Sequence, residues 1–551
     1  MSFHKNLIKT IIITTLITSL YCDEDCSDVK DNELILNTLN GEIKGKCETI
    51  YVYPAGKSSY EVSLMAWYSI PYAQPPIGKL RFKSPLPVNS WTKTRLGIED
   101  PSPCIQNGGK EGSEDCLYLN ILSPYDSYKK SVMNSNKASL LPIFVWIHGG
   151  AYVEGSAAEY DTSMISAKSN IVSVVIQYRL GVLGNFYLEN TDIGGNQFLL
   201  DQNLAIKWIF DNADRFGGDK NRITIVGLSA GSNSVGYHLL MNSSWPYFKN
   251  AVLQSGTPDY DYSYHLTPKK ADSVGIKVAK ASGCTDSKAK ENLVDCLRKV
   301  DAYQIIRIAD TVTGFPIVVL KEDLFKEQPR FLYEKGKFKK CSILVGFTNY
   351  ELLSDDNISK HKDVLKQGNF AAFKRLIKNE INLDDNELDK VIKFYQVPSV
   401  SKTDYYLPFV SIMSDYEYVC PTMKFAESVS IHNKDLYLYV YAHRASTSEL
   451  PYADGAAHAE ELIMEFGEPL FTRSDYESGE KRFSEQMIDY WTNFVVNSKP
   501  SKNDEWPRYR NDNSVAQRNL FFLKMGKIKN TIFDNRTCKF WTDLGVFNYN
   551  Q

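Results

Sequence analysis

The residues whose types and spacing most clearly suggest catalysis are five consecutive ones, Gly227-Leu228-Ser229-Ala230-Gly231. Apolar residues lead up to them and a helix-compatible stretch follows. This layout predicts a sharp strand-to-helix turn that holds the Ser229 hydroxyl outward. Both glycines fit such a turn, because a Cβ at either position would clash. The motif therefore predicts a nucleophilic serine, and the alternative interpretation is a small residue in a tight turn.

A serine hydroxyl becomes a good nucleophile only when a base removes its proton and a third group orients that base. The candidates that follow Ser229 are Glu351, in ILVGFTNYELL, and His458, in DGAAHAEELIMEFG. On position alone, Glu351 could be a solvated carboxylate and His458 a surface-loop histidine. Backbone N–H groups for a developing oxyanion are expected from Ala230 and from His148-Gly149-Gly150-Ala151-Tyr152, unless the two glycines only form a structural turn.

Short apolar runs alternate with helical patterns around these residues, which predicts a parallel sheet covered by helices on both faces. The expected strands are LPIFVWI, NIVSVVIQYR, RITIVG, NAVLQSG, KKCSILVG and DLYLYVYAH. The expected helices are DQNLAIKWIFDNADRF, the stretch after Ser229, and FSEQMIDYWTNFVVNS. Ligands of such open sheets bind at the carboxyl ends of the strands. The polar stretch from Tyr125 to Ala138 is predicted to be a surface loop.

The composition is that of a folded protein with one large core. The chain has 551 residues, 43% of them hydrophobic and 13% aromatic, and a net charge of −3. No block of Lys and Arg indicates nucleic acid as a partner. Because no repeat or clear linker divides the chain, residues 23–551 are predicted to form a single domain.

The first 22 residues are predicted to be a cleaved signal peptide. Lys5 and Lys9 precede an apolar run from Ile11 to Leu20 that is too short to span a bilayer. The alternative is a short buried helix. The C-terminal residues LGVFNYNQ lack a hydrophobic tail, so no transmembrane anchor is expected.

Entry into the secretory route makes the ten cysteines candidates for disulfides, although spacing cannot prove their connectivity. Proximity or place in the chain suggests the pairs Cys104–Cys116, Cys284–Cys296 and Cys420–Cys538. Cys26 and Cys47 are candidates for a fourth pair, which would leave Cys341 as a buried free thiol. Glycosylation sequons occur at Asn242, Asn357 and Asn535.

Taken together, the motifs resemble the type-B carboxylesterase and cholinesterase family of α/β-hydrolases over nearly the whole chain after the signal peptide. The resemblance is carried by IPYAQPPIGKLRF, SEDCLYLNI, VWIHGGAY, YRLG, DQNLAIKWI, FGGDKNRITIVGLSAGS, VLQSGTP, the Glu351 and His458 segments, and CKFW. It implies an α/β-hydrolase fold, with a mostly parallel central sheet, helices on both faces and long excursions. The implied activity is hydrolysis of carboxylic esters through an acyl-enzyme intermediate.

Carried over residue by residue, the resemblance implies Ser229 as the nucleophile, His458 as the general base and acid, and Glu351 as the residue that orients it. It further implies an oxyanion hole of Gly150, Ala151 and Ala230, with Ser255 supporting the acid. Buried ion pairs are implied between Arg81 and Glu114 and between Arg179 and Asp201, and the three cysteine pairs above match the family's disulfides. No cofactor and no metal are implied.

The sequence also departs from the family. Leu228 replaces the usual Glu before the nucleophile, and Leu352 and Ala459 replace glycines beside the acid and the histidine. The loop between Cys104 and Cys116 has no aromatic residue to bind a quaternary ammonium group. These differences favour a general carboxylesterase acting on uncharged small-molecule esters over an acetylcholinesterase.

Two alternatives are an inactive member with a structural, storage or adhesion role and a lipase-like hydrolase. The expected location is outside the cell or in the lumen of a secretory or storage vesicle. The acyl and alcohol preferences and the oligomeric state stay open.

Overall fold

The computed structural model describes residue 26 and residues 29–547, except 259–264, 286–289, 313–317, 321–323, 326, 354–361, 400–403, 449–454, 472–475 and 511–518. The predicted signal peptide (1–22) and the sequon at Asn357 lie outside the described residues. Asn242 is exposed and Asn535 is half-buried at the start of the last helix.

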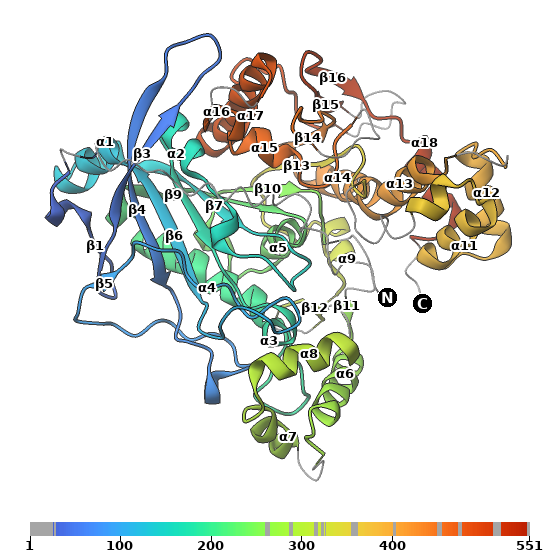
Figure 1. The fold of residues 1–551 in the computed structure, drawn as a ribbon, viewed down its shortest axis with the longest axis horizontal. Helices are drawn as coiled ribbons and strands as arrows, with labels where there is room; N and C mark the ends of the chain where they lie inside the picture. The colour runs from blue at the N-terminus through green and yellow to red at the C-terminus, as the bar shows by residue number, and fades with distance from the viewer. Residues whose placement is uncertain are drawn as a thin grey trace.

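One sheet of eleven strands organises the fold, in the order β16-β15-β14-β13-β10-β9-β7-β8-β6-β4-β3 (Figure 1). A three-stranded sheet, β1-β2-β5, and a two-stranded sheet, β11-β12, lie outside it. The strands are β1 Ile35–Asn37, β2 Glu42–Lys44, β3 Lys46–Val52, β4 Tyr60–Pro71, β5 Arg95–Leu96, β6 Tyr118–Pro124, β7 Leu141–Ile147, β8 Val172–Ile176, β9 Gly218–Leu228, β10 Asn250–Gln254, β11 His265–Leu266, β12 Val318–Val319, β13 Ser342–Thr348, β14 Leu436–Tyr441, β15 Asn519–Leu523 and β16 Lys529–Ile532.

The central part of the large sheet is parallel from β8 to β15, as the alternating apolar and helical patterns predict. The six strands expected from the sequence are β7, β8, β9, β10, β13 and β14. All seven residues of β7 are buried, which is the pattern of a strand covered on both faces. β3, β4 and β6 add an antiparallel edge, and β16 is antiparallel at the other edge. The chain is an α/β-hydrolase.

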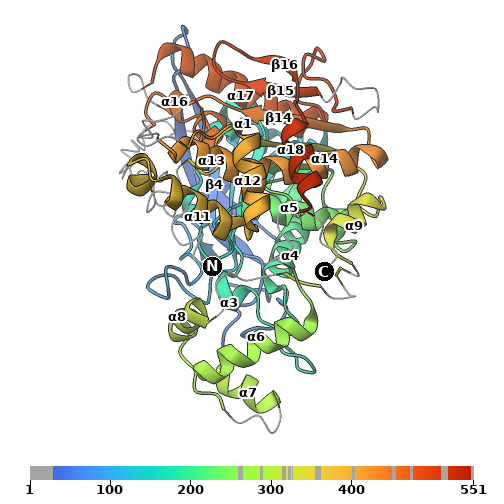
Figure 2. The same cartoon turned by 90° about the vertical axis from the view of Figure 1, so that its right-hand side faces the viewer.

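Helices cover both faces of this sheet (Figures 1 and 2). They are α1 Tyr125–Tyr128, α2 Ser163–Ser169, α3 Gly181–Gly184, α4 Gln197–Asn212, α5 Ala230–Leu240, α6 Pro268–Ala281, α7 Lys290–Leu297, α8 Ala302–Val312, α9 Pro329–Glu334, α11 Phe370–Ile381, α12 Asp385–Phe394, α13 Tyr406–Ser414, α14 Cys420–His432, α15 Glu461–Glu465, α16 Glu468–Phe471, α17 Ser478–Asn497 and α18 Arg536–Leu544. α4, α5 and α14 pack on one face of the strands, and α2 and α17 on the other.

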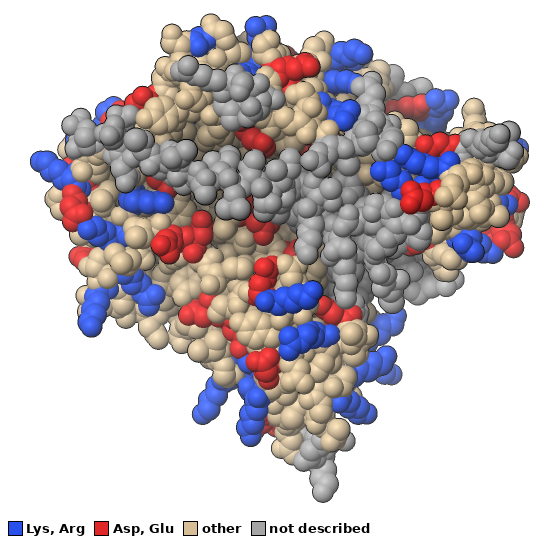
Figure 3. All heavy atoms as spheres, in the orientation of Figure 1, with Lys and Arg blue, Asp and Glu red and all other residues tan. Residues whose placement is uncertain are grey.

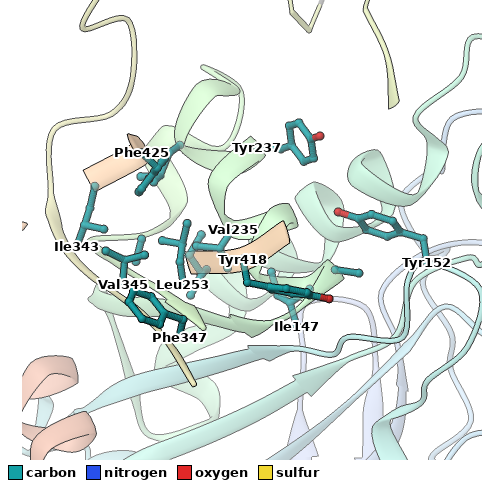
Figure 4. Close-up of a cluster of buried hydrophobic side chains, with 14 of the residues drawn as sticks. Ile147, Tyr152, Val235, Tyr237, Leu253, Ile343, Val345, Phe347, Tyr418 and Phe425 are labelled. Atoms are coloured by element: carbon teal, nitrogen blue, oxygen red, sulfur yellow. The ribbon is translucent and has the colours of Figure 1, made fainter. Parts of the chain in front are cut away.

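Successive side chains of β9 show how the strands join these two layers. Ile225 belongs to the apolar cluster under α5, whereas Val226 belongs to the cluster under α17. This alternation follows from the period of two along a strand. Figure 4 shows part of the first cluster, where Val235 of α5 meets Leu253 of β10 and Val345 of β13.

Two excursions extend from the sheet. α6, α7 and α8 form a lobe around their own apolar cluster, at the bottom of Figures 1 and 2. α11, α12, α13 and α18 lie together on the side that faces the viewer in Figure 2. Lys and Arg are interspersed with Asp and Glu on the face shown in Figure 3. Among the described residues, no helix is both long and apolar enough to cross a membrane.

The prediction of a surface loop from Tyr125 to Ala138 is wrong. Helix α1 covers Tyr125–Tyr128 and a further helical turn runs through Lys129–Met133. Tyr125 and Tyr128 are buried, and the Tyr128 ring lies 5.2 Å from that of Trp67. Two aromatic residues three positions apart fall on one side of a helix and bury against the sheet edge, even within a polar stretch.

The disulfides and ion pairs expected from the sequence are present in the structure. Disulfides join Cys26 to Cys47, Cys104 to Cys116, Cys284 to Cys296 and Cys420 to Cys538. Cys341 is a free thiol, half-buried rather than fully buried, and burial raises its pKa to about 12.

Both implied ion pairs form through two parallel N–H···O bonds each. Arg81 donates to Glu114 at 2.6 Å twice, and Arg179 donates to Asp201 at 2.8 and 2.6 Å. Removal from water raises the pKa of Asp201, and the charge of Arg179 acts against that shift.

Candidate active site

The order of the strands fixes where a ligand should bind. The chain runs from β7 outward to β8 and then returns to the other side of β7 to form β9. Open α/β sheets bind ligands at such a reversal, beyond the carboxyl ends of the strands. Ile147 pairs with Gly227, so the turn after β7 and the turn after β9 lie side by side. Gly149 is close enough that a Cβ there would lie 3.2 Å from the Ser229 Cβ.

Ser229 occupies the strained turn predicted from the sequence. Its φ of 57° and ψ of −122° lie outside the regions that residues with a Cβ prefer. The Ser229 N–H donates to the Gln254 carbonyl at 2.8 Å, and its carbonyl accepts from the Asn233 N–H at 2.9 Å. A Cβ on Gly227 would overlap the Gly231 carbonyl, and one on Gly231 would overlap the Ile147 carbonyl. The glycines therefore let two strands and α5 converge on the serine.

The turn after β7 carries three consecutive residues with positive φ, Gly150, Ala151 and Tyr152, at 99°, 51° and 62°. The Gly150 carbonyl accepts from the N–H groups of Val153 and Glu154 at 2.9 and 3.0 Å. Such a turn directs successive N–H groups to one side, as an oxyanion hole requires.

Ala230 lies opposite this turn, as the first residue of α5. First-turn N–H groups of a helix have no intrahelical partner and carry the positive end of the helix dipole. The amide of Ala230 is therefore suited to stabilise a developing negative charge.

Two buried aromatic side chains, whose contacts the sequence did not reveal, hold the turn after β7. The Tyr178 hydroxyl donates to the His148 carbonyl at 2.6 Å, and the His148 ring stacks on the Tyr178 ring at 4.3 Å. His148 Nδ1 lies 2.8 Å from the Gly149 carbonyl. Burial lowers the pKa of His148 to about 4, so a neutral ring donates this bond at neutral pH.

The first disulfide loop also supports this turn. Gln106, inside the Cys104–Cys116 loop, accepts from the Gly155 N–H at 2.9 Å and donates to the Gly155 carbonyl at 3.3 Å. The loop thus lies against the segment that follows the turn after β7. No feature of the sequence around Gln106 indicates this contact, since Gln106 and Gly155 are 49 residues apart in the chain.

Glu351 and His458, 107 residues apart in the chain, meet in the structure. His458 Nδ1 lies 2.5 Å from Glu351 Oε2, and the His458 N–H donates to the Glu351 carbonyl at 3.1 Å. The Thr348 N–H donates to the other Glu351 carboxylate oxygen at 2.7 Å. Glu351 is fully buried and His458 is 3% exposed, so neither is the solvated residue of the alternative interpretation. The ring of Tyr418 lies 5.1 Å from the His458 ring.

Further carboxyl groups are buried behind this pair, on α15. Burial and the charge of Glu351 raise the pKa of Glu461 to about 7. Burial and the charge of Glu461 raise the pKa of Glu465 well above its ordinary value. Gln254 donates to Glu465 at 2.7 Å and accepts from the Trp491 indole at 3.1 Å. The sequence analysis missed this network, although EELIME places two Glu four residues apart on one helix face.

The three departures from the family have different structural consequences. Leu228 is buried in the apolar cluster under α17, and Leu352 is buried in the cluster under α5. Ala459 adopts a φ of 69°, a conformation that glycine takes without strain.

Ser255 lies at the end of β10 and its N–H donates to the Gly346 carbonyl at 2.9 Å. Its hydroxyl is buried without a hydrogen-bond partner among the described residues, so its support of Glu351 stays a prediction.

Comparison with known proteins identifies the family. The Carboxylesterase family matches residues 32–541, and the chain belongs to it. The acetylcholinesterase of Leptinotarsa decemlineata is 30% identical over 94% of this chain and 87% of its own length. The cholinesterase of Mus musculus is 28% identical over 93% and 87%, and the acetylcholinesterase of Bungarus fasciatus is 30% identical over 85% and 81%. The chain is a carboxylic ester hydrolase.

Proposed function

We propose that Ser229, His458 and Glu351 form the catalytic triad of a serine carboxylesterase. His458 takes the Ser229 proton through Nε2 while Glu351 holds Nδ1, and Ser229 Oγ attacks the ester carbonyl. The backbone N–H groups of Gly150, Ala151 and Ala230 stabilise the oxyanion. Collapse of this intermediate expels the alcohol, which takes the proton from His458, and leaves an acyl-enzyme that water, activated by the same histidine, hydrolyses.

The observation that carries this proposal is the buried contact between His458 Nδ1 and Glu351 Oε2 at 2.5 Å. A carboxylate on Nδ1 fixes the tautomer in which Nε2 is free to accept a proton. A member with only a structural, storage or adhesion role would need neither this buried pair nor a strained serine after β9. The glycine-dependent turn at Ser229 supports the same interpretation.

The proposed substrates are uncharged carboxylic esters. The first disulfide loop carries no aromatic side chain, and its Gln106 is bonded to Gly155. Leu228 adds no negative charge beside the nucleophile. Recognition of a quaternary ammonium group uses aromatic faces and nearby negative charge, so choline esters should be poor substrates.

We infer a location outside the cell or in a secretory or storage vesicle, for residues 23–551 as one domain without the predicted signal peptide. Four disulfides favour an oxidising compartment, where such bonds persist.

A fluorophosphonate probe tests the nucleophile. We expect a stoichiometric adduct on Ser229, located by mass spectrometry, and none with Ser229→Ala. The variant Glu351→Gln should lower kcat by roughly 10³- to 10⁴-fold, because an amide stabilises the wrong histidine tautomer. Glu189→Gln, at an exposed site, is the matched control. A folded, disulfide-bonded protein that takes no label would favour the non-catalytic role.

A further inference from the structure

A hollow of about 510 Å³ lies at the amino ends of the parallel strands, whereas Ser229 follows the carboxyl end of β9. It is lined by residues at the amino ends of the parallel strands, including Asn250 at the start of β10 and Ser342 at the start of β13. The nucleophile follows the other end of β9, about 25 Å along the strand from Asn221 at a rise of about 3.3 Å per residue. The hollow is therefore separate from the proposed active site, and its volume falls within the range of about 300–1,000 Å³ typical of ligand sites.

Four lysines line this hollow, from three different segments: Lys220, Lys249, Lys339 and Lys340. In the described part of the chain, none of their ammonium groups pairs with a carboxylate. Lys220 lies over the Phe210 ring at 5.3 Å, and Lys340 lies over the Phe338 ring. The Lys339 ammonium donates to the Trp245 carbonyl and lies 4.9 Å from the Phe248 ring. We call these four residues the lysine cluster.

The charge of the lysine cluster is not neutralised locally. The one carboxylate among the lining residues is Asp435, and Arg508 donates to it at 2.8 Å. Burial lowers the pKa values of Lys339 and Lys340, and the Cys341 sulfur acts against that shift at Lys339. Four uncompensated cations contrast with the net charge of −3 of the whole chain. Such a local field attracts anions.

The other lining groups indicate the kind of anion. Trp245 and Phe210 are half-buried and offer aromatic surface, while Asn221, Ser342 and Ser498 offer amide and hydroxyl groups. Because the Ser498 hydroxyl is itself buried, Asn221 and Ser342 are the neutral groups that can meet a ligand. Aromatic faces and such neutral groups suit sugar rings, and lysines bind sulfate oxygens as point charges without the planar match that arginine requires.

The lysines come from separate segments at the amino ends of neighbouring strands, so a ligand with repeated charges can contact several of them at once. We propose that the hollow with its lysine cluster binds a sulfated polysaccharide.

Binding to immobilised heparin tests this proposal in the full disulfide-bonded protein. The variant Lys220→Gln/Lys249→Gln/Lys340→Gln removes the three exposed charges of the cluster and spares Lys339, which is half-buried. The control is Lys79→Gln/Lys93→Gln/Lys390→Gln, which removes three exposed charges far from the hollow in sequence. We expect the first triple variant to bind about tenfold more weakly at 0.1 M NaCl and the control to change less than about twofold. Equal losses would assign binding to net charge and overturn the proposal.

Three further outcomes decide the nature of the ligand. Desulfated heparin should bind at least about tenfold more weakly, since most of the ionic contacts are lost. Equal binding of the desulfated chain, or equal competition by a poly-glutamate peptide of the same length, would overturn a sulfated polysaccharide. If millimolar inorganic sulfate displaced heparin fully, the hollow would be a site for small anions, and the proposal of a polysaccharide ligand would be overturned. Unchanged thermal unfolding midpoints of both triple variants confirm that the folds are comparable.

Discussion

At the residue scale, three of the residues with a strained backbone lie in the segments of the proposed active site. Ala151, Ser229 and Ala459 each have a Cβ and a φ between 51° and 69°. A residue with a Cβ in this region costs about 1–2 kcal/mol, so surrounding packing must hold each one in place. Packing that holds this strain also fixes the turn after β7, Ser229 and the residue after His458.

Ala459 gives a direct test, because glycine adopts its φ of 69° without strain. Ala459→Gly should stabilise the protein by about 0.5–1 kcal/mol, the relieved strain less the added freedom of the unfolded chain. Urea unfolding with the disulfides intact measures the change. Ala457→Gly, at a neighbouring site whose φ is not positive, should instead destabilise by about 1 kcal/mol. A loss of stability in Ala459→Gly would contradict the strain argument.

A single buried carboxyl should make stability depend on pH. Burial, with the charge of Glu351, raises the pKa of Glu461 from 4.5 to about 7. The folded state therefore holds this proton more tightly than the unfolded state, and stability falls as pH rises from 4.5 to 7. The loss amounts to about 3 kcal/mol at most.

Replacing this group with a neutral one removes that loss. Glu461→Gln should be more stable than the parent protein at pH 8, by about 1–3 kcal/mol, and similar to it at pH 4.5. Urea midpoints at the two pH values give the comparison, and Glu189→Gln controls for loss of one negative charge. Parallel pH profiles for Glu461→Gln and the parent would argue against proton binding by Glu461.

At the scale of elements, the site depends on how neighbouring strands and helices are joined. Arg179 follows β8 and Asp201 lies on α4, and three hydrogen bonds, one of them from the Arg179 backbone N–H, join the helix to the segment after the strand. Asp201 is fully buried and Arg179 is 3% exposed. An unpaired charge left at such a site costs far more than the intact pair contributes.

Arg179→Met should therefore destabilise the protein by about 3–5 kcal/mol, because it leaves the buried Asp201 carboxylate without its cation and with only the backbone N–H of residue 179. The double variant Arg179→Met/Asp201→Leu should recover much of this loss. Urea unfolding of both variants measures the difference. A double variant less stable than the single one would show that the pair contributes more than mutual neutralisation.

At the scale of the whole molecule, the disulfides close loops of very different length. Cys420 and Cys538 are 118 residues apart and join α14 to α18, whereas Cys284 and Cys296 are 12 apart within one lobe. A crosslink restricts the unfolded chain more when the loop is longer.

Removing the long crosslink should cost more. Cys420→Ala/Cys538→Ala should lower the free energy of unfolding by about 5 kcal/mol, against about 3 kcal/mol for Cys284→Ala/Cys296→Ala. Chemical unfolding under oxidising conditions tests the order. Equal losses would show that packing around the cysteines outweighs loop length.

The sequence by itself determined the local architecture and the identity of the proposed catalytic residues. Gly227 and Gly231 specify the turn at Ser229, because no other residue fits there. Uninterrupted apolar runs specify the parallel strands, because both faces of those strands are buried. These features depend on neighbours in the chain, so a pattern can reveal them.

Only the tertiary structure decided what depends on distant pairs. The contact of Glu351 with His458, the bonds of Gln106 to Gly155 and the stacking of His148 on Tyr178 each need the sheet to bring separate segments together. The burial of Tyr125 was mispredicted for the same reason, since a polar stretch does not reveal the sheet edge that covers it. Packing also creates the lysine cluster and the acidic network of Glu461 and Glu465 behind the proposed triad. The interaction between charged groups depends on their separation and burial, and only the fold sets both.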